Sequence, residues 1–544
     1  MGAPESNAGD DFHFWWSGTR VLELIEPGTD KTVVVIEGLS HVDDPDESYE
    51  AVDVAEYFGG DTLEAASAVN LSQLKYSTKH PGTAWTVSRL CEKRTRRPAN
   101  GGSSSTRSVI ADLAGVYLQL LKKLDRSEIQ RKVYIHLVSN QPGNPLVQEA
   151  VASAAHWARS RRPGEGRPAL LKALTDPQHA DVVKRLSDAV GQVLTSEQFC
   201  DFLAVLDLSR TGSLGRAALA RGVRARAASL TPGRDDESAL RLFELVRREA
   251  LPESTRRGIR AEDVLAALGL ADPLDLYPAS ARLTPLDNPL PAPGARVIAE
   301  TLLAHPGAIV VAHGPAGAGK TTAIRQLGDH LPSGSVVTLF DCYGGGEYLS
   351  SGEERHTPQR FITQTINDLA RQCGSPFLIR PPAADEELWR RLGRALEDAV
   401  KALDPGAVLV LAVDAADNAA FAAHKRGDRG FLAGLTGLPL PSRATVVLTT
   451  RSHRVKSLDA SGAPQVELAP FDQTTSTAHM RRYRSDASPA DATAFHHRTD
   501  GNPRAQYYAL TQAETNKWEM TALLESCART PSPCSRCCLS RHCR

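Results

Sequence analysis

The stretch GPAGAGKT at residues 314–321 decides the fold of the second half of this chain, because it specifies the strand, loop and helix around it. An apolar run at residues 309–312 precedes it, and the helix-compatible sequence TAIRQL at residues 322–327 follows it. Glycines let successive backbone amides turn inward on an anion, and the start of the next helix adds its positive dipole end. The order strand, G-x-x-x-x-G-K-T and helix predicts a phosphate-binding loop, which we favour over a glycine-rich turn without a ligand.

The chemistry of this loop indicates a nucleoside triphosphate, ATP or GTP, bound with Mg²⁺, and the ATPase resemblance described below makes ATP the expected nucleotide. The ammonium of Lys320 can reach the β and γ phosphates, and the hydroxyl of Thr321 can hold the metal ion. The residues expected to bind the nucleotide here are Gly314, Pro315, Ala316, Gly317, Ala318, Gly319, Lys320, Thr321 and Thr322.

Two further apolar runs predict strands that complete this site. Residues 407–413 (AVLVLAV) end at Asp414, where an acid can organise the water shell of the magnesium ion. Residues 444–449 (ATVVLT) lead toward Arg451. We therefore expect a parallel sheet, with Thr321 and Asp414 as the metal ligands.

Four ordered motifs between about residues 291 and 513 resemble those of the NACHT-like group of STAND ATPases. Beyond the phosphate loop, DAADN at residues 414–418 is similar to the D-x-x-D-E ending of that group, TR at 450–451 to its arginine sensor, and DGNPR at 500–504 to the turn that begins its helical lid. The resemblance implies catalytic roles for Asp414, Asp417 and Arg451, a nucleotide contact from Pro503, and assembly into a homo-oligomer on activation.

One position departs from the pattern of the group. Asn418 stands where the group commonly carries a glutamate that orients the attacking water, so hydrolysis is either slow or dependent on Asp417. The stretch FDCYGGGEY at residues 340–348 is either a flexible loop or, by resemblance to bacterial members of the group, a segment near the nucleotide.

Residues near the amino terminus fit a metal-dependent nuclease. Runs of β-branched residues predict strands, at residues 32–37, 52–58, 69–76 and 133–138. Glu37 closes the first strand and Asp53 opens the second. Gln73 and Lys75 share one face of the third, because side chains alternate along a strand.

Nuclease folds of the PD-(D/E)xK type need this order of groups, in which acids hold Mg²⁺ beside the scissile phosphate and a lysine positions the attacking water. The passage at residues 73–80 also resembles nuclease-like domains fused to bacterial antiviral effectors. The resemblance makes all four residues catalytic, Glu37 and Asp53 metal ligands, and DNA the partner. The alternative is an ordinary α/β domain in which these acids are surface carboxylates and Lys75 pairs with one of them. His13, among four aromatic residues, is predicted to be a packed edge residue rather than a ligand.

The whole pattern predicts an α/β multidomain chain. Apolar residues recur at helical spacing between residues 147 and 276, and prolines concentrate at residues 283–294, which indicates a linker. The predicted parts are a small mixed-sheet nuclease-like domain (10–145), a helical connector (146–282), a P-loop ATPase with a parallel sheet (283–475), a partial helical lid (476–520) and an irregular cysteine-rich tail that we interpret as degenerate sequence (521–544).

Composition limits the partners. The net charge of −1 means that a nucleic-acid site must be a local basic surface. No apolar run approaches the ~20 residues that cross a bilayer, and four cysteines are scattered through the main body of the chain. We therefore expect a cytoplasmic protein with reduced cysteines and no membrane partner.

These observations favour a nucleotide-regulated effector of the defence type, in which an ATPase module controls a metal-dependent endonuclease. One alternative is a signalling scaffold whose first domain binds partners or nucleic acid without cleaving. Another is a stand-alone motor or chaperone-like ATPase, which would turn over ATP without oligomer switching.

Overall fold

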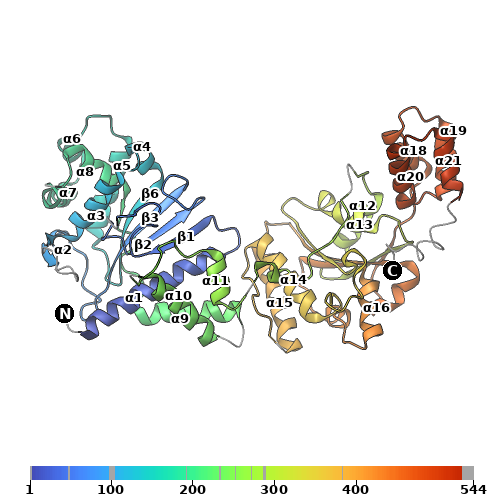
Figure 1. Ribbon diagram of the computed structural model, residues 1–544, viewed down its shortest axis with the longest axis horizontal. Helices are drawn as coiled ribbons and strands as arrows, with labels where there is room; N and C mark the ends of the chain where they lie inside the picture. The colour runs from blue at the N-terminus through green and yellow to red at the C-terminus, as the bar shows by residue number, and fades with distance from the viewer. Residues whose placement is uncertain are drawn as a thin grey trace. The chain divides into compact units, whose positions relative to one another are not determined.

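Two five-stranded sheets carry the fold of the computed structural model, one in each half of the chain (Figure 1). The structure describes residues 3–46, 49–96, 105–191, 193–231, 235–251, 253–270, 272–285, 289–382 and 384–529. The chain divides into two units, Met1–Pro273 and Leu274–Arg544. Within the described residues, every helix is too short or too polar to cross a membrane.

The first sheet is mixed, in the order β1-β2-β3-β6-β7. The first three strands pair antiparallel, and β3, β6 and β7 pair parallel. The strands are β1 (Lys31–Ile36), β2 (Val54–Phe58), β3 (Ala68–Lys75), β6 (Val133–Ser139) and β7 (Leu206–Asp207). The first four confirm the strands predicted from the β-branched runs, and a separate hairpin, β4 (Arg94–Arg96) with β5 (Ser105–Arg107), lies outside the sheet.

Helices cover both faces of this sheet (Figure 1). One face packs through Val35, Leu71 and Leu137 into a core shared with α3, α5, α7 and α8. On the other side α1 packs against α9 and α10. The helices of this unit are α1 (Ala3–Leu22), α2 (Val87–Cys91), α3 (Val109–Leu120), α4 (Arg126–Lys132), α5 (Pro145–Ser160), α6 (Arg167–Ala173), α7 (Pro177–Val190), α8 (Ser196–Val205), α9 (Arg216–Leu230), α10 (Asp235–Glu249) and α11 (Ala261–Ala267).

The expected separate connector at residues 146–282 is therefore corrected. Helices α5 to α8 share the core of the first sheet, and β7 adds a strand to that sheet. Ile259 also exchanges two backbone hydrogen bonds with Val34 of β1, at 3.0 and 2.8 Å. The amphipathic pattern predicted helices correctly. It could not distinguish helices of a separate connector from helices that cover the first sheet, because both have the same periodicity.

The second sheet is wholly parallel, in the order β12-β8-β11-β10-β9. Its strands are β8 (Ile309–Gly314), β9 (Val336–Asp341), β10 (Leu409–Asp414), β11 (Ala444–Arg451) and β12 (Gln465–Glu467). A parallel sheet is covered on both faces, which explains the unbroken apolar runs. Helices α12 (Pro293–Ala304) and α13 (Lys320–Arg325) cover one face, and α14 (Pro358–Cys373), α15 (Asp385–Ala402), α16 (Ala416–Arg426) and α17 (Leu432–Thr436) cover the other (Figure 1). The carboxyl ends of β8, β11 and β10 consequently lie side by side.

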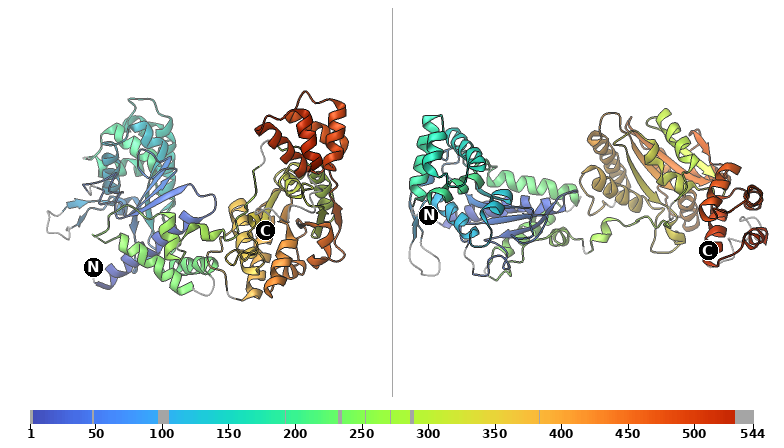
Figure 2. Two further views of the ribbon diagram at one scale, coloured as in Figure 1. Left: turned by 45° about the vertical axis from the view of Figure 1, so that its right-hand side comes forward. Right: turned by 90° about the horizontal axis from the view of Figure 1, so that it is seen from above.

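Four helices follow the sheet and form a small bundle, which is seen as one group in both views of Figure 2. They are α18 (Gln473–Tyr483), α19 (Pro489–Thr499), α20 (Pro503–Thr515) and α21 (Met520–Arg529), and their core includes Met480, Phe495, Leu510 and Leu523. The helix α21 corrects the expectation of an irregular tail from residue 521, because it packs within this bundle. The remaining tail, residues 530–544, lies outside the described residues.

Candidate functional site

The glycine-rich loop joins β8 to α13 as the motif predicts. Gly317 and Gly319 adopt left-handed backbone conformations, with φ of 80° and 83°. A side chain would strain both positions, so glycine is what lets the loop turn tightly into the first turn of α13. Gly319 is the residue directly before that helix, and Lys320 and Thr321 are its first two residues.

A carboxylate and two hydroxyls meet where three strands end. The Thr321 hydroxyl donates to Oδ2 of Asp414 at 2.7 Å, and the Thr449 hydroxyl donates to Oδ1 at 2.5 Å. Asp414 is 3% exposed, and burial raises the pKa of its carboxyl, while both hydroxyl bonds act in the opposite direction. The geometry fits a magnesium site, because a hydroxyl and a carboxylate at the phosphate loop are hard oxygen ligands.

Thr449 is a site residue that the sequence interpretation missed. Its hydroxyl also accepts from the backbone N–H of Ala415 at 2.7 Å, so it fixes the start of α16 as well as the carboxylate. Its position two residues before Arg451 on the neighbouring strand was a usable signal, because parallel strands end together at the site.

Lys320 lies folded back on its own loop. Its Nζ donates to the carbonyls of Gly314 at 2.9 Å and Pro315 at 2.8 Å. Burial lowers the pKa of this ammonium to about 8, against the opposing influence of Asp414 and Asp417. A phosphate group offers this lysine a charged partner in place of two neutral carbonyls.

Arg451, at the end of β11, is held by α16. Its Nε donates to Oδ2 of Asp417 at 2.6 Å, and its Nη2 donates to Oδ1 of Asn418 at 2.8 Å. Arg454 is a second, longer partner of Asp417, at 3.4 Å. Three residues singled out in the sequence are thus brought together, but Arg451 points to α16 and would have to exchange these bonds to contact a phosphate.

The helical bundle reaches the phosphate loop through the turn at residues 500–504. Asn502 caps α20, and its Nδ2 donates to the carbonyl of Ala316 at 2.9 Å. The backbone N–H of Arg504 donates to the carbonyl of Gly317 at 3.3 Å. A methyl group placed on Gly319 would lie 3.9 Å from Pro503, so the predicted nucleotide-binding residue Pro503 does lie beside the loop.

The opposite end of the site holds a buried arginine that the sequence interpretation also missed. Arg355 is 2% exposed, and its guanidinium donates to the carbonyls of Ala279 (3.1 Å), Ser280 (2.9 Å) and Asp341 (2.9 Å). Its Nε donates to Glu353 at 2.8 Å. Gly344 makes room for it, because a methyl group there would lie 2.4 Å from Nε.

We call residues 276–282 the strap, because side chains of the second unit bind its backbone along its length. Asn367 donates to the Leu276 carbonyl at 2.6 Å, and Gln364 accepts from the N–H of Ala279 at 2.9 Å. The N–H of Arg282 donates to the carboxylate of Asp341 at 3.0 Å. Asp341 pairs in register with Asp414, and the N–H of Cys342 donates to the Asp414 carbonyl at 3.0 Å. The strap therefore ends one strand away from the carboxylate at the phosphate loop.

In the first unit, the two predicted acids lie together at the ends of β1 and β2. The N–H of Glu37 donates to the Asp53 carbonyl at 2.9 Å, and the Asp53 carboxylate accepts from the N–H of Leu74 at 2.5 Å. One ligand atom each from Glu37, Asp53 and His13 lie within 4.8 Å of one another. Such a set of oxygens and one imidazole can hold a divalent cation.

Gln73 and Lys75 follow on β3. The side chain of Gln73 is 2% exposed, and its Oε1 has no hydrogen-bond partner within the described structure. Lys75 is half-buried at the end of the strand, in register with Ser139 of β6. By strand alternation both side chains share one face, as predicted.

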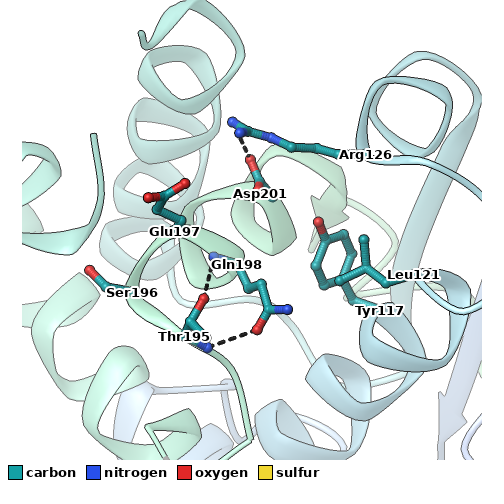
Figure 3. Close-up of a pocket in the computed structure, with 8 residues that line it drawn as sticks. All are labelled: Tyr117, Leu121, Arg126, Thr195, Ser196, Glu197, Gln198 and Asp201. Carbon is teal, nitrogen blue, oxygen red and sulfur yellow. Dashed lines mark hydrogen bonds and ion pairs between the residues drawn. The ribbon is translucent and has the colours of Figure 1, made fainter. Parts of the chain in front are cut away.

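A surface pocket of about 490 Å³ in the first unit involves none of these residues (Figure 3). It lies between α3, α4 and α8, and Arg126 and Asp201 form a 2.8 Å ion pair at its rim. Thr195 and Gln198 are occupied in the capping box of α8. These four side chains thus already serve the fold, whereas the buried hydroxyl of Tyr117 has no hydrogen-bond partner within the described residues.

Comparison with known proteins finds a family match within the second unit. Residues 304–435 match the model of the AAA domain family, and no curated protein matches the chain. Among solved structures, the chain is similar to a Walker-type ATPase of Pyrococcus abyssi, with 17% identity over 43% of this chain and 69% of that one and a TM-score of 0.32.

It is also similar to the Signal Transduction ATPase with Numerous Domains (STAND) protein with a tetratricopeptide repeat sensor from Pyrococcus horikoshii. The identity is 15% over 46% of this chain, and the match spans 33% of that chain with a TM-score of 0.26. Because both TM-scores are low, the assignment of an ATPase domain to the second unit depends on the family match and on the geometry at Lys320, Thr321 and Asp414. Together these show that the second unit of the chain contains a P-loop ATPase domain.

Proposed function

We propose that the chain is a nucleotide-regulated effector of the defence type, in which ATP binding by the second unit controls a metal-dependent endonuclease in the first. The contact that carries the ATPase half is the 2.7 Å bond from Thr321 to Asp414, beside the folded-back Lys320. These residues would hold Mg²⁺ between them, and the ion would supply charge neutralisation at the phosphates. Lys320 would orient the same phosphates, and Arg451 would reach them after leaving Asp417.

The endonuclease half is supported by the arrangement of acids in the first unit. Glu37 and Asp53 converge from two strand ends, and Gln73 and Lys75 lie on the adjacent strand. A metal ion between the acids would polarise a phosphodiester, and Lys75 would hold the attacking water. DNA is the proposed substrate, and a cytoplasmic location and a homo-oligomeric active form belong to the same proposal.

The strap supports control of one unit by the other. It begins three residues after Pro273, where the first unit ends. Its last bond, from Arg282 to Asp341, lies beside Asp414 in the sheet. A shift of Asp414 on nucleotide binding would therefore reach the chain segment that leads to the first unit.

The test is cleavage of plasmid DNA by the full chain with Mg²⁺ or Mn²⁺, with and without ATP, comparing the parent with Lys75→Ala and Lys320→Ala. Lys401→Ala, an exposed lysine on α15, is the matched control. Cutting that is lost in Lys75→Ala and altered in Lys320→Ala supports the proposal.

Two other outcomes count against it. Cutting that survives Lys75→Ala places the activity elsewhere or in a contaminant. Intact DNA under every condition, with ATP still bound, favours a signalling scaffold whose first unit binds partners without cleaving.

A further inference from the structure

We propose that His13, Glu37 and Asp53 form one divalent-cation site, and that the histidine makes this site prefer Mn²⁺ to Mg²⁺. The inference deepens the proposed endonuclease function by naming a third ligand and the metal. It also reverses the sequence interpretation, in which His13 was a packed edge residue. The three residues come from α1, from the position after β1 and from the position before β2, so only the fold brings them together.

Their spacing suits a single ion. One ligand atom from each residue lies within 4.8 Å of the other two. Ligands of an ion bound at about 2.0–2.3 Å are separated by roughly 3 Å when adjacent and by up to about 4.6 Å when opposite. A small adjustment of side chains would therefore place all three around one cation.

The backbone around each ligand is well fixed. Hydrogen bonds from Glu37 to Asp53 (2.9 Å) and from Gly38 to Val52 (2.7 Å) tie the end of β1 to the start of β2. The helix α1 is anchored next to His13 by Phe12, which is fully buried and stacks on Tyr76 with ring centroids 4.9 Å apart. Since Tyr76 directly follows β3, this stacking holds His13 at the end of β3 that carries Gln73 and Lys75.

A buried, unpartnered group points to a ligand at the same place. Asp53 donates its N–H to the Ser72 carbonyl at 2.9 Å and accepts the N–H of Leu74, so it lies opposite Gln73. The Oε1 of Gln73, a residue that the strand register places across from Asp53, is buried without a hydrogen-bond partner within the described residues. An unsatisfied buried acceptor costs about 1–3 kcal/mol. A cation at Asp53, or a water that the cation binds, would satisfy it.

The ligand types set the choice of metal. Mg²⁺ takes oxygen ligands almost exclusively and gives up its waters reluctantly. Imidazole nitrogen favours first-row transition metals, and Mn²⁺ accepts carboxylates as readily as Mg²⁺ does. One imidazole with two carboxylates therefore favours Mn²⁺, whereas two carboxylates alone would not discriminate.

The test is a titration of the full chain with Mn²⁺, followed by electron paramagnetic resonance, without nucleotide and in an Asp414→Asn background that disables the metal ligand of the second unit. We expect His13→Ala to weaken Mn²⁺ binding by about tenfold or more. His156→Ala, an exposed histidine on α5, is the matched control and should bind as the parent does. In the parent, Mg²⁺ should displace Mn²⁺ only at an excess of about tenfold or more.

A second variant separates ligation from packing. His13→Asp replaces the nitrogen ligand by oxygen, so it should retain a bound ion but lose the preference for Mn²⁺ over Mg²⁺. A histidine that merely packs would give no such change in metal preference. Circular dichroism of each variant checks that α1 and the sheet remain folded.

The outcomes distinguish this inference from the proposed function. If Asp53→Asn abolishes Mn²⁺ binding while His13→Ala and His13→Asp leave affinity and preference unchanged, the site consists of carboxylates alone and the inference fails, but the endonuclease proposal stands. If neither Asp53→Asn nor His13→Ala affects binding, no ion binds at this face and both fail. Mn²⁺ binding that requires His13, without cleavage of DNA, supports the inference and contradicts the proposed endonuclease function.

Discussion

The two units hold their candidate sites in opposite ways. In the second, hydrogen bonds link every charged residue at the ends of β8, β10 and β11 to a neighbour, as Asp414 is linked to Thr321 and Thr449. In the first, the Asp53 carboxylate accepts from the backbone N–H of Leu74, and the carbonyl oxygen of Gln73 has no hydrogen-bond partner within the described residues. The charged groups of the nucleotide site are therefore paired before a ligand binds, whereas the first unit leaves a buried acceptor on Gln73 that a bound cation or its water would satisfy.

The largest effect should come from the buried arginine that holds the strap. Arg355→Met leaves three carbonyls without this donor and Glu353 with only its ion pair to Arg282, so we expect a loss of about 3–5 kcal/mol in the free energy of unfolding of the second unit. Chemical unfolding followed by fluorescence measures it. The control is Arg394→Met, on the exposed side of α15, which should change stability by less than about 0.5 kcal/mol. A loss below about 1 kcal/mol for Arg355→Met would show that the strap is held by other contacts.

The next effect tests whether the two sites are chemically separate. Asp414→Asn should lower the rate of ATP hydrolysis by about 10²–10³-fold, because it removes a charge that stabilises the metal and the transition state. Asp53→Asn should change the rate of ATP hydrolysis by less than about twofold, because Asp53 lies next to the first sheet and Asp414 belongs to the second. Phosphate release at saturating ATP measures both. A large loss of hydrolysis in Asp53→Asn would contradict the separation.

A smaller effect concerns pH. Burial lowers the pKa of Lys320 to about 8 in the nucleotide-free site, and bound phosphates would raise it again. Below pH 8 the ammonium is charged before binding, so the affinity for ATP should be flat. Above pH 8 binding must take up a proton, so the affinity should fall by up to about tenfold per pH unit. Calorimetric titration between pH 7 and pH 9.5 measures it, and Lys320→Arg should flatten the profile. A parent affinity that rises with pH would overturn this assignment.

The smallest effect should come from the contact between the bundle and the loop. In Gly317→Ala the new methyl group would lie 2.6 Å from Oδ1 of Asn502, at a backbone φ of 80°. We expect ATP affinity to fall by about fivefold, since a left-handed non-glycine residue costs roughly 1–2 kcal/mol. Gly328→Ala is the control, because a methyl group there meets no atom within 4 Å. Equal affinities for the two variants would mean that the bundle moves freely away from the loop.

Sequence patterns predicted the parts of each site that are local. The motif at residues 314–321 requires its own strand and helix, and the apolar runs before Asp414 and Arg451 were long enough to be identified as buried strands. The extent of the first unit could not be predicted in this way. The strand β7 has only two residues, too few for a pattern, and helices α5 to α8 have the same periodicity whether they cover this sheet or a separate core.

By itself, the sequence determined the phosphate loop, the acid that faces it and the strands that carry both, because each depends on residues adjacent in the chain. Only the tertiary structure decided that Thr449 fixes Asp414, that Arg355 holds the strap and that His13 lies close to Glu37 and Asp53. Those contacts join residues from separate elements, and no local pattern records them. The physical reason is that hydrogen bonds and metal ligation depend on distance in space, which strand register and helix packing set after the local structure has formed.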